Sequence, residues 1–165
     1  MKEVFELLNK LEIEYTKVDH EKADTIEDCK KIEETLGCEI CKNLFLCNRQ
    51  QTEFYLLLMK GDKRFVTKDF SKTIGVSRLS FASPENLKKY LNVTPGSASV
   101  LGLIFDSEKT VKLYIDKEVA QQEFIGCHPC DNTSTLKIRT KDIFEKFLPY
   151  IGVKETIVEI IENEQ

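Results

Sequence analysis

The hydrophobic period changes along the chain, and this change limits the fold more than any other feature of the sequence. From Val4 to Leu11, apolar residues recur every three or four positions, which predicts an amphipathic helix. The middle of the chain instead holds short apolar runs at 43–47 and 54–59, joined by the polar stretch 48–53. Runs of this length with a hairpin-length link between them predict paired strands. The chain must therefore combine helices with a sheet.

Capping and turn residues predict the other elements. Thr25 can cap a helix that carries Glu27 and Asp28 in its first turn and ends at Gly37. A short apolar run at 65–66 predicts a third strand, which would complete a β-meander. Further expected elements are a strand over 15–19, short helices over 67–74 and 84–91, strands over 100–105, 111–115, 124–127, 136–139 and 155–160, and a helix from Thr140 to Gly152.

The order of these elements predicts the fold class. Helices and strands mix without a regular strand–helix–strand repeat, which indicates an α+β fold with a mixed, largely antiparallel curved sheet flanked by helices. A length of 165 residues, 41% of them hydrophobic, suits a single domain over 1–165 with its own core. No apolar stretch is long enough to cross a membrane, and the first residues do not resemble a secretion signal. We therefore expect no membrane partner and a cytoplasmic location.

The net charge of −4 is unevenly distributed along the chain. Residues 42–150 carry 17 basic and 12 acidic side chains, so the middle of the chain is basic. Six of these cations lie close together in sequence and have only Asp62 and Asp69 as nearby acids: Lys60, Lys63, Arg64, Lys68, Lys72 and Arg78. This run predicts a local patch that attracts phosphate, which permits an RNA partner without requiring one.

Two Cys-x-x-Cys pairs suggest metal or redox chemistry, but their setting argues against both. The pair at Cys38 and Cys41 is separated from the pair at Cys127 and Cys130 by 85 residues, far more than the ~15–20 of a zinc ribbon. The second pair also lacks the capped helix that lowers the thiol pKa in thioredoxin-like motifs. We therefore interpret them as buried or half-buried thiols beside a His-Pro turn, and expect no bound metal.

Three places carry groups that suit a binding or catalytic cleft. His128 follows an expected strand and precedes a proline, where a side chain can point into a cleft. Lys42 and Asn43 open an apolar strand, and they put an ammonium and an amide at the edge of the sheet. The small residues at 95–99 follow a turn, so their backbone N–H groups can approach an anion or a carbonyl oxygen. His20, the other histidine, is expected at an exposed strand end.

Six short blocks occur in an order that is similar to one known family. They are KNLFL at 42–46, GDKR at 61–64, RLSFASPE at 78–85, PGS at 95–97, GLI at 102–104 with Asp106, and His128-Pro129 with Asn132. Over nearly its whole length the chain resembles the ProX branch of the YbaK and prolyl-tRNA editing-domain superfamily. Each block alone is weak evidence, but the eight-residue block in the correct order with the others makes coincidence improbable.

The resemblance implies that the protein hydrolyses alanine wrongly esterified to proline tRNA. In this interpretation Lys42 holds the acceptor end of the tRNA, the backbone of the 96–97 turn approaches the aminoacyl ester, and His128 helps to define the small amino-acid pocket. The catalytic residues implied are Lys42, Gly96 and Ser97, and the substrate-binding residues are Asn43, Ala98 and His128. The partners implied are the acceptor end of mischarged tRNA(Pro) and, as a second partner to test, prolyl-tRNA synthetase.

The chain departs from the family pattern in two places. The family loop commonly reads Gly-x-x-x-Pro, whereas Val100 stands where the proline is usual and so removes a fixed φ from the loop. Cys127 and Cys130 replace larger apolar residues beside the His-Pro pair. The change at Val100 affects the rigidity of the loop, and the changes at Cys127 and Cys130 affect the wall of the pocket.

Hydrolysis of an aminoacyl ester needs few groups, because the ester is already activated. A placed water, donors for the developing oxyanion and exclusion of the wrong side chain are sufficient, with no metal, cofactor or covalent nucleophile. Three alternatives stay open at this point. The protein could bind aminoacyl-tRNA or a free amino acid as a non-catalytic regulator, it could deacylate Cys-tRNA(Pro), or it could be a thiol or zinc protein built on the two cysteine pairs.

Overall fold

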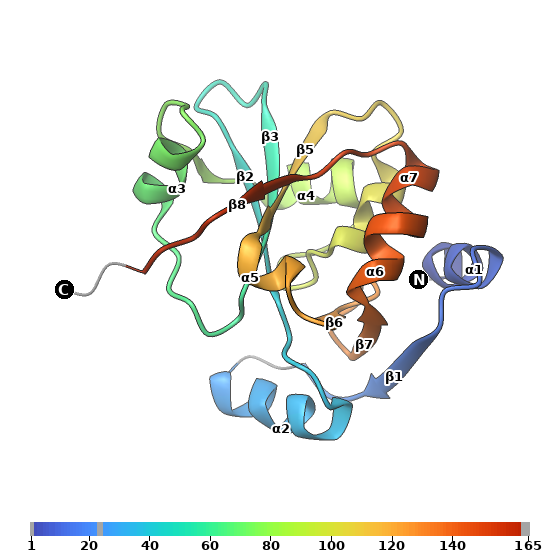
Figure 1. Ribbon diagram of the computed structural model, residues 1–165. Coiled ribbons are helices and arrows are strands. Elements are labelled where there is room, and N and C mark those ends of the chain that lie inside the picture. The colour runs from blue at the N-terminus through green and yellow to red at the C-terminus, as the bar shows by residue number, and fades with distance from the viewer. Residues whose placement is uncertain (1, 23–24, 163–165) are drawn as a thin grey trace.

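The computed structural model describes residues 2–22 and 25–162, and its strands form two sheets (Figure 1). The strands are β1 (Tyr15–Asp19), β2 (Lys42–Cys47), β3 (Phe54–Met59), β4 (Ser80–Phe81), β5 (Val111–Asp116), β6 (Phe124–Cys127), β7 (Ser134–Arg139) and β8 (Thr156–Val158). The α-helices are α1 (Lys2–Lys10), α2 (Ile26–Leu36), α3 (Thr67–Thr73), α4 (Pro84–Leu91), α5 (Lys117–Ala120), α6 (Thr140–Asp142) and α7 (Leu148–Ile151). A 3₁₀ helix, η1 (Val100–Phe105), and a π-helical segment, η2 (Ile143–Phe147), complete them.

The five-stranded sheet has the order β4-β2-β3-β5-β8 and contains both kinds of pairing. β2 is antiparallel to β3 and β4, whereas β3 is parallel to β5 and β5 is parallel to β8. The three-stranded sheet has the order β1-β7-β6 and is antiparallel throughout. These pairings confirm the expected α+β class and the prevalence of antiparallel neighbours. The strands are divided between two sheets, however, rather than forming the one curved sheet that was expected.

The sequence of β3 is apolar at every position because both faces of the strand are buried. All six of its residues are buried, and alternate side chains enter two different hydrophobic clusters. Phe54, Leu56 and Leu58 pack into the larger cluster, and Tyr55, Leu57 and Met59 pack into the smaller one. Since successive side chains of a strand point to opposite faces, both faces of this strand are covered. β3 is therefore the centre of the fold.

A short parallel bridge between Ile40 and Gly126 links the two sheets. The Cys41 N–H donates to the Gly126 carbonyl at 2.9 Å, and the Gly126 N–H donates to the Glu39 carbonyl at 3.1 Å. A Cβ atom at position 126 would lie 2.5 Å from the Glu39 carbonyl oxygen, so only glycine fits this approach. The bridge brings the end of β6 beside the start of β2, and so brings His128 towards Lys42.

The structure confirms the two capped helices that the sequence predicts most clearly. The Thr25 hydroxyl accepts a hydrogen bond from the Asp28 N–H at 3.0 Å, and Gly37 ends α2 with a φ of +81°. The Ser83 hydroxyl likewise accepts from the Asn86 N–H at 3.2 Å at the start of α4. The predicted helix from Thr140 is also present, as the continuous run of α6, η2 and α7.

The expected strand at 65–66 is wrong, and the meander does not form. β3 already has β2 on one edge and β5 on the other, so no edge is left for a third consecutive strand. Val66 instead precedes the first turn of α3, while the Phe65 ring packs 6.0 Å from Phe70 and 5.8 Å from Phe81, between ring centroids. Residues 60–66 therefore form a loop, which becomes important for the site.

The expected strand at 100–105 is also wrong, because this segment is the 3₁₀ helix η1. The Ser99 hydroxyl accepts a hydrogen bond from the Leu101 N–H at 3.1 Å, and the Ser99 carbonyl accepts from the Gly102 N–H at 2.9 Å. A continuous apolar run has no period, so the sequence pattern does not separate a buried strand from a buried helical turn. The final strand is shorter than expected, since β8 covers 156–158 rather than 155–160.

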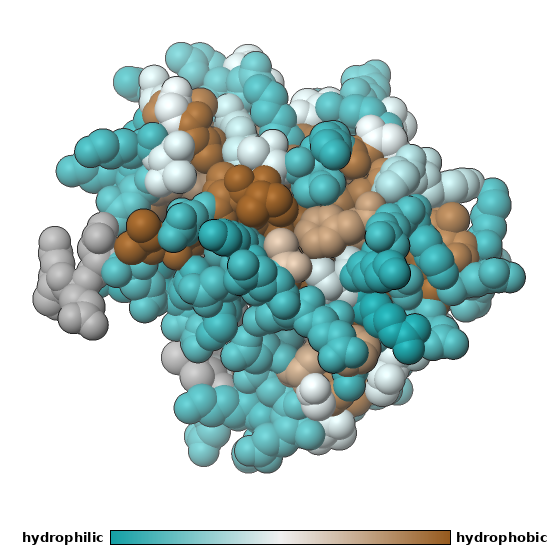
Figure 2. Space-filling view, viewed as in Figure 1, coloured by the Kyte–Doolittle hydropathy of each residue, from teal (hydrophilic) through white to brown (hydrophobic). Residues whose placement is uncertain are grey.

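The surface is mostly hydrophilic on the face seen in Figure 2, with apolar side chains gathered over β8 and α3. Val66, Ile157 and Ile161 are the exposed large apolar residues of these segments. Within the described part of the chain, no helix has the length and apolar character needed to cross a bilayer.

Candidate active site

A cleft of about 580 Å³ opens between α2, the start of β2, loop 96–98 and the end of β6. Its lining includes most of the residues that the sequence singled out: Lys42, Asn43, Gly96, Ala98 and His128. The three distant stretches of chain that carry these residues therefore converge around one space. Ser97 is the exception, since it is 3% exposed and does not line the cleft. A space of this size suits a small molecule or the end of a larger one.

Lys42 is the first residue of β2, and its ammonium lies at the cleft. The side chain is half-buried, and its Nζ donates to the backbone carbonyl of Lys63. This bond uses one of three ammonium donors, so the others can bind an anion in the cleft. The position of the Lys42 charge thus depends on the loop that presents the Lys63 carbonyl.

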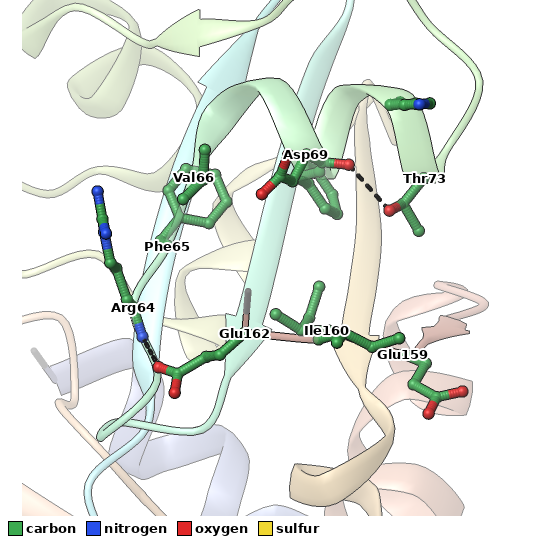
Figure 3. Close-up of a pocket in the computed structure, with 11 residues that line it drawn as sticks. Arg64, Phe65, Val66, Asp69, Thr73, Glu159, Ile160 and Glu162 are labelled. Atoms are coloured by element: carbon green, nitrogen blue, oxygen red, sulfur yellow. Dashed lines mark hydrogen bonds between the residues drawn. The ribbon is translucent and has the colours of Figure 1, made fainter. Parts of the chain in front are cut away.

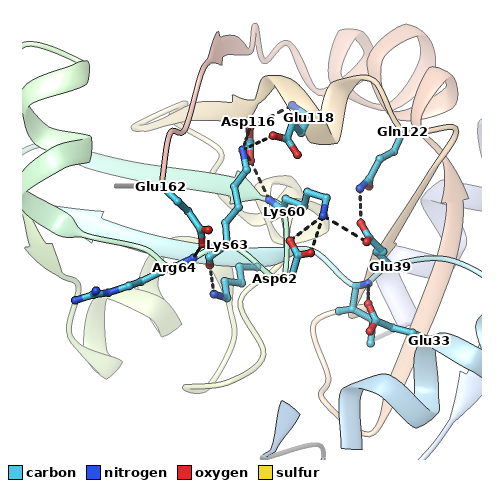
Figure 4. Close-up of polar contacts among 12 residues, drawn as sticks. Glu33, Glu39, Lys60, Asp62, Lys63, Arg64, Asp116, Glu118, Gln122 and Glu162 are labelled. Carbon is cyan, nitrogen blue, oxygen red and sulfur yellow. Dashed lines mark hydrogen bonds and ion pairs between the residues drawn. The ribbon is translucent and has the colours of Figure 1, made fainter. Parts of the chain in front are cut away.

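That loop is held by a buried ion pair between Lys63 and Asp116 (Figure 4). The Lys63 Nζ lies 3.1 Å from Asp116 Oδ2, 3.1 Å from Glu118 Oε1 and 2.7 Å from the Ile160 carbonyl. Asp116 is fully buried, and its carboxylate also accepts from the Lys60 N–H at 3.1 Å. A buried carboxylate with several donors fixes its partners firmly, so residues 60–63 form a rigid wall behind Lys42.

These contacts also bear on the predicted phosphate-attracting patch. Lys63 faces Asp116 and Glu118, and Lys60 contacts Asp62 at 2.7 Å and Glu39 at 3.5 Å. The Arg64 backbone N–H is bonded to the Glu162 carboxylate. Two of the six cations of the run, Lys60 and Lys63, are therefore paired with carboxylates, and the patch stays a prediction for the others.

Loop 94–100 is tied down at both ends. The Ser97 N–H donates to the Thr94 carbonyl at 3.0 Å, and the Val100 N–H donates to Asn43 Oδ1 at 3.0 Å. Gly96 has a φ of +89°, and a Cβ there would lie 3.4 Å from the side-chain nitrogen of Asn132. The Asn43 bond also bears on the missing proline, because a proline at position 100 would have no N–H to donate. Asn43 therefore anchors the loop to β2.

Gly96 and Ala98 line the cleft, and each carries a backbone N–H group. Within residues 2–22 and 25–162, neither N–H has an acceptor, whereas the Ser97 N–H is occupied. Free N–H groups at a concave site are the usual way to bind a carbonyl oxygen that gains charge. The N–H groups at positions 96 and 98 are therefore unoccupied beside the cleft, whereas that of Ser97 is not.

His128 enters the cleft as a neutral ring with a defined proton position. Its Nδ1 lies 2.8 Å from the Ser134 carbonyl oxygen, which only accepts hydrogen bonds, so Nδ1 carries the proton. Burial is the main effect on this group, and it lowers the pKa of His128 below the ordinary 6.5. The Ser134 bond and Asp131 oppose that shift. Near neutral pH, Nε2 is therefore an unprotonated acceptor.

The carboxylates that line the cleft are engaged with the protein itself. Glu33 Oε2 accepts from the Ile40 N–H at 2.8 Å, Glu39 Oε2 accepts from Gln122 at 2.6 Å, and Asp62 pairs with Lys60. These bonds hold α2, the start of β2 and the 61–62 turn together (Figure 4). The other polar groups of the lining residues include the ammonium groups of Lys30 and Lys42, the Gly96 and Ala98 N–H groups and the His128 imidazole.

The thiols near the cleft are poor nucleophiles. Burial raises the pKa of Cys38 to about 11 and that of Cys41 and Cys130 to about 12, and it raises the pKa of Cys127 as well. Thiols with raised pKa values stay protonated near neutral pH, and the thiolate is the reactive form. In the described ranges, no group of three His, Cys, Asp or Glu side chains is placed to hold a metal ion.

Sequence reasoning missed the contribution of α2 to the cleft. Thr25, Cys29 and Glu33 line it, together with Lys30. Their spacing of four residues puts the first three on one face of the helix. Cys29 also falls in an apolar three- to four-residue pattern with Ile32 and Leu36, which predicts a buried stripe, so the signal was present but had a structural explanation.

A second hollow, of about 740 Å³, lies between α3 and the segment 159–162 (Figure 3). It is lined by Arg64, Phe65, Asp69, Lys72, Glu159 and Glu162, among others. None of the predicted site residues lines this hollow. Its charges are mixed, and its walls come from two short neighbouring segments.

A family model described as the aminoacyl-tRNA editing domain matches residues 20–146. The chain belongs to this family. The matched range includes every residue of the cleft described above. Membership makes the chain an aminoacyl-tRNA editing enzyme, which confirms the expected family and enzyme class.

Individual relatives agree with this assignment to the editing family. The prolyl-tRNA editing protein ProX of Acetoanaerobium sticklandii is 34% identical over 136 residues, which cover 82% of this chain and 83% of that protein. Prolyl-tRNA synthetase associated domain-containing protein 1 of Danio rerio is 30% identical over 144 residues, covering 86% and 78%. Among solved structures, one described as a candidate trans-editing enzyme for prolyl-tRNA synthetase superimposes with a TM-score of 0.68 at 15% identity, covering 97% and 96%. This last match supports the fold alone.

Proposed function

We propose that this editing enzyme removes alanine from mischarged tRNA(Pro), acting on the tRNA after its release from the synthetase. The observation that carries the proposal is the convergence of Lys42, the free N–H groups of Gly96 and Ala98, and the neutral imidazole of His128 around one cleft. The names of the relatives point to prolyl-tRNA editing. We also propose that the protein acts as one domain in the cytoplasm, with prolyl-tRNA synthetase as a second partner.

The proposed reaction is the addition of water to the ester carbonyl carbon. The bond between that carbon and the ribose oxygen then breaks, which releases free alanine and a tRNA with a free terminal hydroxyl. The Gly96 and Ala98 N–H groups donate to the carbonyl oxygen as negative charge develops on it. The neighbouring ribose hydroxyl of the substrate orients the water, so no side-chain general base is required.

Lys42 and His128 hold the two ends of the substrate. The Lys42 ammonium binds terminal phosphate or ribose oxygens, and the Lys63 carbonyl keeps it at the cleft. The unprotonated Nε2 of His128 accepts a hydrogen bond from the α-amino group of the amino acid. Discrimination is steric, because a pocket that fits a methyl group excludes larger side chains, whereas a missing methyl costs only ~1–3 kcal/mol.

The test is a deacylation panel with alanyl, seryl, cysteinyl and prolyl esters of one tRNA(Pro). Alanine release is expected to be fastest, roughly 10- to 100-fold faster than release of the larger side chains. Lys42→Ala should slow alanine release by about 10- to 100-fold, since a hydrogen bond to a charged group is lost. The matched control is Lys141→Ala, which removes a lysine that is 76% exposed on α6 and should leave the rate unchanged.

Two other outcomes would replace the proposal with a specific alternative. Faster release of cysteine than of alanine would make the protein a Cys-tRNA(Pro) deacylase. Tight binding of Ala-tRNA(Pro) without release of alanine by the wild type would make it a non-catalytic binder of aminoacyl-tRNA.

A further inference from the structure

A hydrogen-bonded chain runs from His128, at the cleft, to His20 on the outer side of the three-stranded sheet. The Thr135 hydroxyl lies 3.3 Å from His128 Nδ1 and 2.8 Å from His20 Nε2. His20 Nδ1 in turn lies 2.6 Å from the Glu21 carbonyl. The two imidazole rings are 6.1 Å apart between centroids. His20, which the sequence placed at an exposed strand end, is half-buried and connected to the site.

The direction of each bond follows from its end groups. The Glu21 carbonyl only accepts, so His20 Nδ1 carries a proton and the Nε2 of a neutral His20 ring is an acceptor. The Thr135 hydroxyl has one proton, and it satisfies both neighbours only by donating to His20 Nε2 and accepting from His128 Nδ1. The Ser134 carbonyl accepts from the same Nδ1 proton at 2.8 Å. Every group in the chain is then paired.

Because Thr135 is buried, its hydroxyl depends on the two histidines as hydrogen-bond partners. Thr135 is 0% exposed, so its hydroxyl has no water as a substitute partner. Without an acceptor at His20, the hydroxyl proton could turn towards His128 Nδ1. That rotation favours a ring with its proton on Nε2, which is the atom that faces the cleft. His20 therefore holds the hydroxyl in the orientation that keeps Nε2 free.

We propose that His20 and Thr135 are positioning residues that hold the His128 proton on Nδ1 and leave Nε2 as an acceptor in the cleft. Neighbouring strands supply the three residues, since His128 follows β6, Thr135 lies in β7 and His20 follows β1. The register of β1 on β7, with Asp19 opposite Ser134, sets the spacing between His20 and Thr135. The functional importance of this arrangement rests on the proposed deacylase activity, but the proton position itself does not.

The experiment measures the tautomer of His128 by long-range ¹H–¹⁵N correlation NMR, at about pH 8, where His128 is neutral. The chain has only two histidines, so the His128→Asn spectrum assigns both signals. In the wild type, His128 is expected in the Nδ1–H form. Thr135→Val and His20→Leu should each shift the ratio of the two forms about 2- to 10-fold towards Nε2–H, the effect of one net hydrogen bond.

Two variants separate this role from a general loss of packing. His20→Gln keeps a side-chain acceptor and should retain the wild-type tautomer ratio. Thr16→Val makes the same chemical change as Thr135→Val at an exposed position of the same sheet and should leave His128 unchanged. Rates of Ala-tRNA(Pro) deacylation should follow the fraction of His128 in the Nδ1–H form, so kcat/KM should fall by at most about twofold in Thr135→Val and His20→Leu, because a tenfold shift turns a ratio of about 10:1 into about 1:1.

An unchanged tautomer ratio in Thr135→Val and His20→Leu would overturn the proposal, because the Ser134 carbonyl alone would then fix the proton. A shifted ratio in a protein that releases no alanine would keep the positioning role and remove the proposed activity. The two conclusions can therefore fail separately.

Discussion

The cleft beside α2 and the hollow beside α3 share one loop, yet only the cleft has the chemistry of a site. Gly61 and Asp62 line the cleft, Arg64 lines the hollow, and the Lys63 side chain turns inwards to Asp116. The hollow is the larger, at about 740 Å³ against 580 Å³. The cleft gathers the predicted site residues and pairs its carboxylates internally, whereas the hollow is lined by residues 64–73 and 159–162 with mixed charges. The larger of the two spaces is thus not the one that gathers the predicted site residues.

The largest expected effect comes from breaking the anchor of the shared loop. Lys63→Met leaves the fully buried Asp116 without its ion pair, which should lower the free energy of unfolding by about 3–5 kcal/mol. Denaturant unfolding measures this loss. The comparison variant is Lys60→Met, whose partners Asp62 and Glu39 are 68% and 47% exposed and whose loss should cost about 0–1 kcal/mol. Equal losses in the two variants would mean that Lys63 is not the anchor.

Two glycines give a matched test of the cleft against the α3 side. Gly96 and Gly75 both have positive φ, at +89° and +73°. Alanine at either position carries backbone strain of about 1 kcal/mol, but only the Cβ at 96 approaches another group, the Asn132 amide. We expect Gly96→Ala to lower the rate of alanine release about tenfold and Gly75→Ala to leave it unchanged. Similar rates in the two variants would argue that loop 94–100 does not bind the ester.

The pH dependence of alanine release should show whether His128, and hence the cleft, takes part in the reaction. A protonated ring cannot accept a hydrogen bond, so alanine release should fall as the pH drops through the lowered pKa of His128, below 6.5. Since the unfolded chain binds this proton at higher pH than the folded one, stability also falls from about pH 6.5 down to the folded pKa and then levels. Rate–pH profiles of the wild type and His128→Asn check this, and the acidic limb should vanish in the variant.

The smallest effect is expected in the α3 hollow. Arg64→Ala removes a cation from this hollow and should change the rate of alanine release by less than about twofold. Steady-state deacylation at low and moderate salt measures the change. A loss as large as that of Lys42→Ala would show that tRNA also contacts the hollow, and the distinction between the two regions would then weaken.

Much of the fold could be predicted from the sequence because its signals are local. The Thr25 and Ser83 caps and the glycine stop at Gly37 act within one helical turn, so reading them needs no tertiary information. The run at 100–105 failed because six consecutive apolar residues carry no period. The run at 65–66 failed because strand order, which places β5 beside β3, is a long-range property.

The candidate site was predicted only in part, because some of its features are local in sequence and others depend on long-range contacts. Lys42, the 95–99 turn and His128 stand out locally by residue type, and the structure brings them to one cleft. The internal pairing of Lys63 could not be predicted because its partner Asp116 lies 53 residues away. His20 was missed because its role depends on the register of β1 and β7, which no short stretch of sequence encodes.

The parallel bridge at Gly126 has a consequence for how the enzyme matures during synthesis. The β2–β3 hairpin can form early, since its strands are close along the chain, but it offers Lys42 with no imidazole opposite. The candidate cleft closes only when β6 reaches Ile40, after a loop of 85 intervening residues has been ordered. Contacts of such long range form slowly, because the entropy of loop closure is lost before the stabilising contacts are made. A nascent chain is therefore expected to complete the candidate cleft late in folding, once β6 has been synthesised.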